Sequence, residues 1–184
     1  MNRKTQLAVL AGVLFLFFAA YFASPLLAVR GLVSAAKAGD EARLEQLVDF
    51  PAFRTSLKEE LNTKLVEQMR ADLGDRADGL SGLGMILAPS LISGAVDAFV
   101  TPPAVAAMVR SGEVPNAKDV ARDRARVPSE PSSKVHQSYS YRGLDTFAVR
   151  LTREDRPDDY IDLLMQRRNV FGWKLAAIDL PRKR

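Results

Sequence analysis

The chain opens with a long apolar stretch before apolar and polar positions begin to alternate. An uncharged run extends from Leu7 to Ala23, and apolar residues continue to Val29. A helix needs about 20 apolar residues to cross the hydrocarbon core of a bilayer. The pattern therefore predicts a transmembrane helix within residues 1–29.

The sequence around possible cleavage points favours an uncleaved signal anchor. A signal peptidase site has small residues one and three positions before the cut. The candidate cuts instead place a bulky residue three positions before the cut: Phe18 for a cut after Ala20, Tyr21 for a cut after Ala23 and Leu26 for a cut after Ala28. A cleaved signal peptide and a buried helix of a soluble domain are the alternatives.

Charge next to the apolar run sets the expected orientation. Arg3 and Lys4 precede the run, and positive charge on this side keeps the amino terminus in the cytoplasm. We therefore expect a single-pass protein of the inner membrane, held by residues 7–29, with its body in the periplasm. The chain has no cysteine, so an exported body would contain no disulfide.

Apolar residues then recur at helical spacing. One helix is expected to end at Gly39, and Asp40 is suited to cap a second, short helix. Pro51 fits the first turn of a third helix and should hold Phe50 in an extended conformation. Four apolar residues of this third helix form a stripe expected to pack into the core: Phe53, Leu57, Leu61 and Leu65.

The segment from Leu83 to Val109 is apolar, with Asp97 as its one charged residue. Prolines and glycine interrupt it, which disfavours a second membrane span. We expect a helix over residues 83–100 that covers an apolar surface of the same domain, followed by a short helix capped by Thr101. A second span and a helix lying on the membrane surface are the alternatives, and Asp97 is expected to face water.

The carboxyl-terminal part alternates with a period of two, as strands do. Strands are expected over residues 135–141, 147–151, 160–168 and 171–180, with turns at 142–145, 154–159 and 169–172. Helices followed by an antiparallel meander predict an α+β fold. The expected organisation is an anchor (1–29), a helical part (30–110), a flexible loop (111–134) and the sheet of the same domain (135–184).

Charge makes a nucleic acid an unexpected partner. Beyond residue 29 the 26 basic residues fall to 24, against 22 acidic ones, because only Arg3 and Lys4 lie before that point. The two signs are mixed along the chain, so they create no extended positive field. The basic end, residues 182–184, is expected to be a solvated tail.

No residue pattern predicts catalysis, a cofactor or a metal. Polar candidates for a pocket are His136, Tyr139, Tyr141, Asp145, Asp162 and Asp179, and none has a partner at triad or metal-ligand spacing. The acidic residues around Pro157 lack the ligand spacing of a calcium loop. His136 is expected to be exposed, and the candidate catalytic, cofactor-binding and metal-binding sets are each left empty.

Two functional hypotheses follow. The favoured one is a non-catalytic binding or scaffolding module of the bacterial envelope, whose partner is an envelope protein, a lipid or another hydrophobic ligand. Its groove would involve residues 83–109 and four aromatic strand residues, although Trp173 is expected to belong to the core: Tyr139, Tyr141, Phe147 and Trp173. The alternative is a small-molecule pocket enzyme, which would need at least two buried, converging titratable groups.

Several short motifs carry a resemblance to a known family. Residues 21–56 contain Ser24-Pro25, Ala28-Val29, Gly39-Asp40 and Asp49-Phe50-Pro51, and the chain closes on Phe171-Gly-Trp-Lys-Leu-Ala. This combination resembles a bacterial family of membrane-anchored proteins of unknown function. The resemblance implies membership and assigns a role to no residue.

A weaker likeness concerns the layout of the elements. Helices followed by antiparallel strands resemble the cystatin-like, nuclear-transport-factor-like cone, in which a curved sheet wraps a long helix. Domains of that shape include pocket enzymes, ligand-binding modules and assembly parts, so the likeness does not choose a function.

Overall fold

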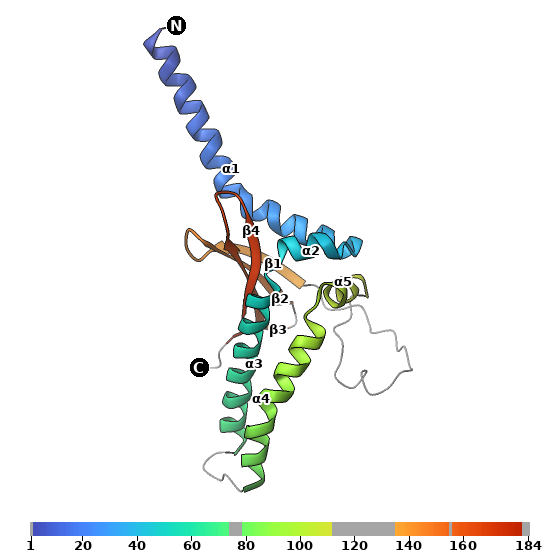
Figure 1. Cartoon of the computed structure of the whole chain (residues 1–184). Coiled ribbons are helices and arrows are strands. Elements are labelled where there is room, and N and C mark those ends of the chain that lie inside the picture. The colour runs from blue at the N-terminus through green and yellow to red at the C-terminus, as the bar shows by residue number, and fades with distance from the viewer. Residues whose placement is uncertain (1, 74–78, 112–134, 155, 182–184) are drawn as a thin grey trace.

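The computed structural model describes residues 2–73, 79–111, 135–154 and 156–181, and within them the chain has the expected α+β fold (Figure 1). Helices come first and an antiparallel sheet follows. The elements are α1 (Arg3–Ala38), α2 (Glu41–Leu47), α3 (Phe50–Leu73), α4 (Gly79–Phe99), α5 (Pro102–Ser111), β1 (Val135–Tyr141), β2 (Thr146–Arg153), β3 (Arg156–Arg167) and β4 (Trp173–Asp179).

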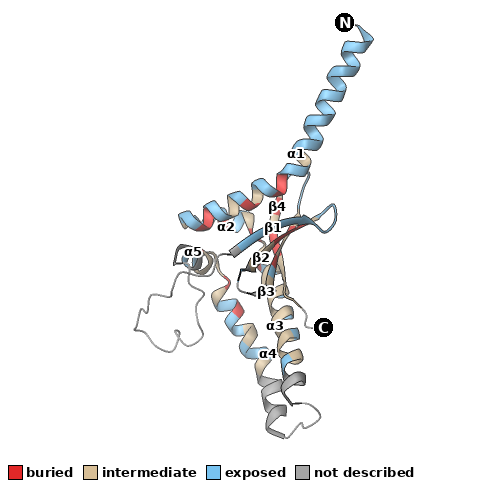
Figure 2. Ribbon diagram, turned by 180° about the vertical axis from the view of Figure 1, so that it is seen from behind, coloured by how far each residue is buried: buried red, intermediate tan, exposed pale blue. Residues whose placement is uncertain are grey.

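Helix α1 is continuous from its apolar amino-terminal part into the body of the protein. Its first half projects away from the rest of the chain and is exposed, whereas buried residues begin at Ser24 (Figure 2). Within the described residues it is the one helix that is long and apolar enough to span a membrane. The predicted boundary between anchor and body, at residue 29, therefore lies inside a single helix.

Pro25 explains the bend of α1 that is visible near its middle in Figure 1. A proline inside a helix has no N–H for the carbonyl four residues earlier, and its ring crowds that carbonyl. The carbonyl concerned belongs to Tyr21, and the Ser24 hydroxyl donates a hydrogen bond of 2.7 Å to it. The helix thus bends without leaving this backbone oxygen unpaired.

The caps predicted after α1 are confirmed. Gly39 has a left-handed conformation (φ 70°), and its N–H bonds the last turn of α1. The Asp40 carboxylate accepts from the N–H of Arg43 at the start of α2. The extended conformation predicted for Phe50 is wrong, because Phe50 is the first residue of α3. Asp49 provides the cap instead, accepting from the N–H of Ala52, and the missing N–H of Pro51 removes one unsatisfied donor.

The apolar middle segment is helical and packs into the protein over its described part, as expected. Val96 of α4 and Val100, the residue that follows α4, are buried in the core. Arg54 of α3 donates to the Val100 carbonyl at 2.8 Å. Asp97 is exposed and pairs with Lys58 of α3 at 2.7 Å. Thr101 caps α5 through a hydrogen bond of 3.4 Å.

The sheet has the order β1-β2-β3-β4 with antiparallel neighbours, which confirms the predicted meander. The predicted turn at 154–159 is too long, since β3 already begins at Arg156. Pro157 is tolerated there because it falls in the register shift between β2 and β3, where pairing passes from Arg156 to Tyr160, and because pairing with β4 begins only at Asp162. The predicted loop at 111–134 lies outside the described residues apart from Ser111, which ends α5.

Helix α3 lies along the outer edge of β4. The Ser56 hydroxyl bonds both the N–H and the carbonyl of Ile178 at 3.1 Å, and Glu60 accepts from the N–H of Leu180. An open edge strand offers unpaired backbone groups to other chains. These side chains satisfy several such groups of β4 and fix α3 against the sheet.

The main core lies between the helices and one face of the sheet. It is formed by buried apolar residues of α1, of the α2–α3 segment, of the α4–α5 segment and of strands β2 to β4: Val29, Val48, Phe50, Val96, Val100, Phe147, Val149, Met165, Trp173 and Leu175. Phe53, Leu57 and Leu61 of the predicted stripe pack against it, as expected, whereas Leu65 is half-buried. The segment of α1 that follows its bend is thus part of the folded body.

Candidate functional site

The bend of α1 meets the sheet at a buried hydrogen bond between residues far apart in the sequence. Trp173 Nε1 of β4 donates to Ser24 Oγ at 2.8 Å. Ser24 and Trp173 are both buried, and the Ser24 hydroxyl in turn donates to the Tyr21 carbonyl. A single serine therefore provides a partner for two backbone or side-chain groups: the buried indole N–H of Trp173 and the partly buried Tyr21 carbonyl, which Pro25 leaves without its helical donor. We call this contact region the α1–sheet junction.

Arg167 is inserted into the α1–sheet junction between aromatic rings. Its guanidinium carbon lies 3.8 Å from the ring centroid of Tyr21 and 4.2 Å from that of Trp173. The side chain is only 7% exposed, and a cation over an aromatic face is stabilised by the ring quadrupole. The stacking places a positive charge in direct contact with both α1 and β4.

Tyr141, the last residue of β1, ties the same part of α1 to the sheet. Its hydroxyl donates to the Phe22 carbonyl at 2.8 Å, and its ring packs edge-on against Phe22, Phe147 and Trp173. Burial raises the pKa of Tyr141, and the nearby Arg167 cation opposes this effect. The net shift favours the protonated, donating form of the hydroxyl.

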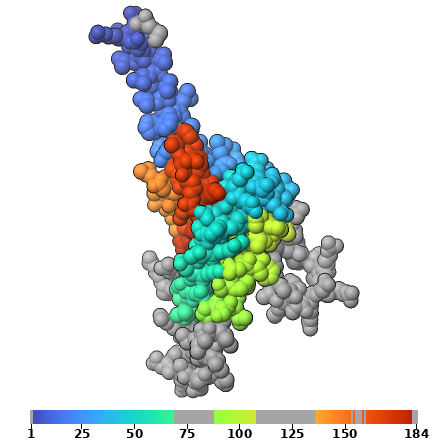
Figure 3. Space-filling view, viewed as in Figure 1, coloured from blue at the N-terminus to red at the C-terminus, as the bar shows by residue number. Residues whose placement is uncertain are grey.

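An open groove of about 610 Å³ lies next to the junction, bounded by α1, α2 and the β3–β4 hairpin. This volume is within the range of small-molecule sites. Its apolar wall comes mainly from α1, and its polar groups come from residues 168–174 and α2, as follows: Ala20, Ser24, Leu27, Ala28, Gln46, Leu47, Arg168, Asn169, Phe171, Gly172, Trp173 and Lys174. Figure 3 shows the β3–β4 hairpin standing against α1, with α2 beside them.

Both cations of the groove have partners in the protein. Arg168 pairs with Asp49 at 2.5 Å, and Lys174 Nζ donates to the Glu45 carbonyl at 3.5 Å. The rim of the groove therefore carries hydrogen-bonding groups, and its wall is apolar. Such a groove can bind an amphipathic ligand, and nothing in its composition provides a nucleophile with an adjacent base.

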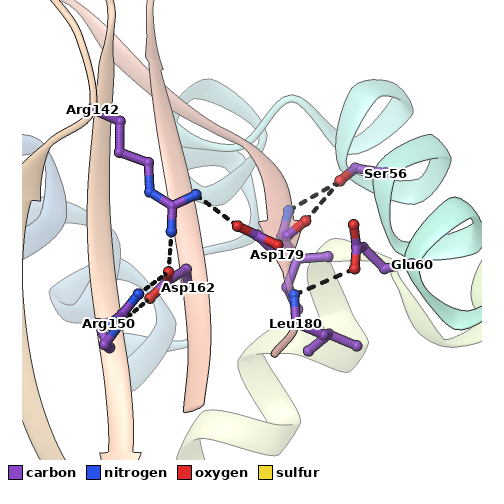
Figure 4. Close-up of polar contacts among 8 residues, drawn as sticks. Ser56, Glu60, Arg142, Arg150, Asp162, Asp179 and Leu180 are labelled. Carbon is purple, nitrogen blue, oxygen red and sulfur yellow. Dashed lines mark hydrogen bonds and ion pairs between the residues drawn. The ribbon is translucent and has the colours of Figure 1, made fainter. Parts of the chain in front are cut away.

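A second polar cluster lies on the other face of the sheet, away from the junction (Figure 4). Asp162 of β3 is fully buried, and Arg150 of β2 holds it with two hydrogen bonds of 2.8 Å. Arg142 also pairs with Asp162 and reaches Asp179 of β4 at 2.6 Å. The hydrogen bond to Asp162 raises the pKa of Arg150 and is the largest cause of that shift. The cluster links β2, β3, β4 and the β1–β2 turn electrostatically.

The structure brings only some of the sequence candidates together. Asp162 and Asp179 share Arg142, and Tyr141, Phe147 and Trp173 meet in one aromatic group. His136 is exposed on β1, as expected, and Trp173 is a core residue, as expected. The remaining two sequence candidates, Tyr139 and Asp145, lie apart from the cluster around Asp162. Tyr139 stacks on Phe147, and the Asp145 carboxylate lies 3.5 Å from the Arg167 guanidinium.

Sequence reasoning missed the residues that complete both clusters. Ser24 and Arg167 at the junction and Arg142 and Arg150 beside Asp162 have no local signature, because their partners are distant in the chain. The Ser24-Pro25 pair was a usable signal, since a serine before a helical proline can supply the missing donor. In the described part of the chain no three His, Cys, Asp or Glu side chains gather as a metal site would require.

Removing the Ser24 hydroxyl should weaken the junction specifically. We expect Ser24→Ala to lower the free energy of unfolding by about 1–3 kcal/mol, because Trp173 Nε1 and the Tyr21 carbonyl lose their partner. Trp173 is the chain's one tryptophan, so its fluorescence during denaturant titration in detergent reports on this site. The matched control is Ser34→Ala, at an exposed position of the same helix. Equal stability and emission in the two variants would contradict the assignment.

Neutralising both arginines around Asp162 should destabilise the sheet more than the two single changes combined. Arg142→Met or Arg150→Met leaves one cation beside the carboxylate, whereas the double variant leaves a buried charge without either arginine. The expected loss for the double variant is about 3–5 kcal/mol, measured by chemical denaturation. Adding Asp162→Leu should recover much of it. Additive single effects with no recovery would refute the cluster's role.

Comparison with known proteins identifies a family and no characterised relative. No curated protein and no solved structure matches the chain. The likeness to cone-shaped domains thus stays a prediction. One family model, described as "Protein of unknown function (DUF2939)", matches residues 14–108, which is just over half of the chain. The matched stretch ends before the sheet begins. The protein belongs to this family of unknown function.

Proposed function

We propose that this protein is a single-pass, membrane-anchored domain of the bacterial envelope that acts by binding and not by catalysis. The observation that carries the proposal is the continuity of α1. Its exposed apolar half is the length and composition of a membrane span, and its second half is part of the core. A body built on such a helix would be held at the membrane surface.

The flanking charge supports export of the body. Arg3 and Lys4 at the start of α1 favour a cytoplasmic amino terminus. The rest of the chain would then lie on the periplasmic side of the inner membrane. The absence of cysteine is compatible with either compartment, so orientation rests on these two residues.

The contacts around α1 support an uncleaved anchor. Phe22, Ser24 and Val29 all contact or join the folded body. Cleavage after Ala20 would leave a new amino terminus beside them, and cleavage after Ala28 would remove the acceptor of Trp173. A chain cut after Ala23 or Ala28 would therefore lose part of its own junction, and a chain cut after Ala20 would carry a charged amino terminus at Tyr21, on whose ring the Arg167 guanidinium stacks.

The groove beside the junction supports binding as the activity. It combines an apolar wall with hydrogen-bonding groups and lies where the body would meet the membrane. Asp162 is the buried titratable residue that best resembles a catalytic group among the described ones, yet two arginines pair with it. These features fit a lipid, another hydrophobic ligand or an envelope protein better than a reaction.

Topology can be tested by protease protection in spheroplasts of a version tagged after Arg184. The proposal predicts that external protease digests the tag while the chain sediments with membranes and resists alkaline extraction. A protected tag in intact spheroplasts would contradict export of the body, and a chain in the soluble fraction would contradict anchoring.

Paired arginine substitutions in α1 provide the matched control for this experiment. Leu10→Arg together with Val13→Arg places two charges in the proposed span and should release the chain from membranes or prevent its insertion. Val33→Arg changes an exposed apolar residue of the same helix beyond its bend. This variant should fractionate like the unchanged protein.

A further inference from the structure

The two turns at the α1 end of the sheet expose large apolar side chains. These turns comprise residues 142–145 and 168–172, and they adjoin one another, since the N–H of Arg167 bonds the carbonyl of Asp145 at 2.9 Å. Leu144 is 69% exposed, Val170 51% and Phe171 46%. We refer to these three residues as the sheet tip.

The sheet tip lies alongside the apolar run of α1. The ring of Phe171 packs edge-on against that of Phe17, with centroids 5.7 Å apart. Phe17 precedes Pro25 by about two helical turns and belongs to the uncharged run that would cross the bilayer. The β3–β4 turn therefore reaches along α1 toward the membrane.

The length of α1 before this contact is too short to span a bilayer alone. Even counted from the charged residue Arg3, the helix as far as Leu16 is only about 21 Å long at about 1.5 Å per residue, and its apolar run from Leu7 to Leu16 is about 15 Å long. The hydrocarbon core is about 30 Å thick. About 9–15 Å of the core must then be crossed by the part of α1 that already has the sheet tip beside it.

We propose that the sheet tip is embedded in the outer boundary of the bilayer that α1 crosses, so that the body is held by two membrane contacts. This inference rests on the proposed membrane anchoring. The shortfall of about 9–15 Å is enough to place the sheet tip at the depth of about 5–10 Å at which apolar faces of interfacial segments reside. The occupant of this apolar surface is the lipid at the boundary between headgroups and acyl chains.

The backbone of the turns is prepared for such a position. Unpaired peptide groups are costly in an apolar medium, so an inserted turn must satisfy them internally. The carbonyls of Val170 and Leu144 both accept from the Arg167 guanidinium, at 2.6 and 3.1 Å. The Asn169 side chain accepts from the N–H of Phe171 at 3.2 Å and from that of Gly172.

The residues around the sheet tip also have the chemistry of a membrane interface. Tyr141, which is 39% exposed, is an amphipathic aromatic residue of the kind enriched at headgroup level. Arg168 lies at the base of the same turn, with 42% of its side chain exposed, and can face lipid phosphates. Asp145, the acidic residue of the neighbouring turn, is balanced in part by Arg167.

Depth can be measured because the chain contains no cysteine. Phe171→Cys carries an environment-sensitive nitrobenzoxadiazole probe in the full chain, reconstituted into phosphatidylethanolamine–phosphatidylglycerol vesicles. Leu91→Cys is the matched control, because Leu91 is apolar and 72% exposed but lies on α4, away from α1. Val170→Cys repeats the measurement at a second tip position.

We expect blue-shifted emission from the probe in the Phe171→Cys and Val170→Cys variants, and loss of intensity with lipids brominated in the upper acyl chain. Neither effect is expected in the Leu91→Cys variant. Vesicle flotation of the same samples separates the two levels of the argument. A floating chain whose tip probes emit as in water and are not quenched would overturn the inference while leaving anchoring intact. A chain that does not float would overturn both.

Discussion

The hydrogen bond from Trp173 Nε1 to Ser24 Oγ joins the helix that would cross the membrane to the last strand of the sheet. It exists because Pro25 frees the Tyr21 carbonyl and Ser24 occupies it, which orients the serine oxygen as an acceptor for the indole. Arg167 and Tyr141 close around the same point. The position of the sheet relative to α1 is fixed by these contacts.

This constraint links the fold to the proposed function. A transmembrane helix followed by a loose linker would leave a domain free to reorient, whereas α1 enters the core without a break. The bend lets one half of the helix leave the body while the other half crosses the end of the sheet (Figure 1). The groove and the sheet tip then occupy defined places relative to the span.

Sequence signals predicted the elements better than the contacts between them. Gly39 and Asp40 act through neighbouring backbone groups, so their caps could be predicted from local chemistry. Phe50 shows the limit of such rules, since a cap by Asp49 outweighed the pre-proline preference. Trp173 and Ser24 are 149 positions apart, and their pairing depends on how the helices and the sheet assemble. The predicted groove was misplaced for the same reason: of the residues expected to form it, Trp173 lines the groove at the junction, whereas the described residues of the segment 83–109 do not.

The most direct test of a helix shared by membrane and core is the intact mass and amino-terminal sequence of the chain purified from membranes. The account predicts that residues 2–29 are retained, with or without Met1, because residues 17–29 complete the junction and the core. A mature amino terminus directly after Ala20, Ala23 or Ala28 would contradict it.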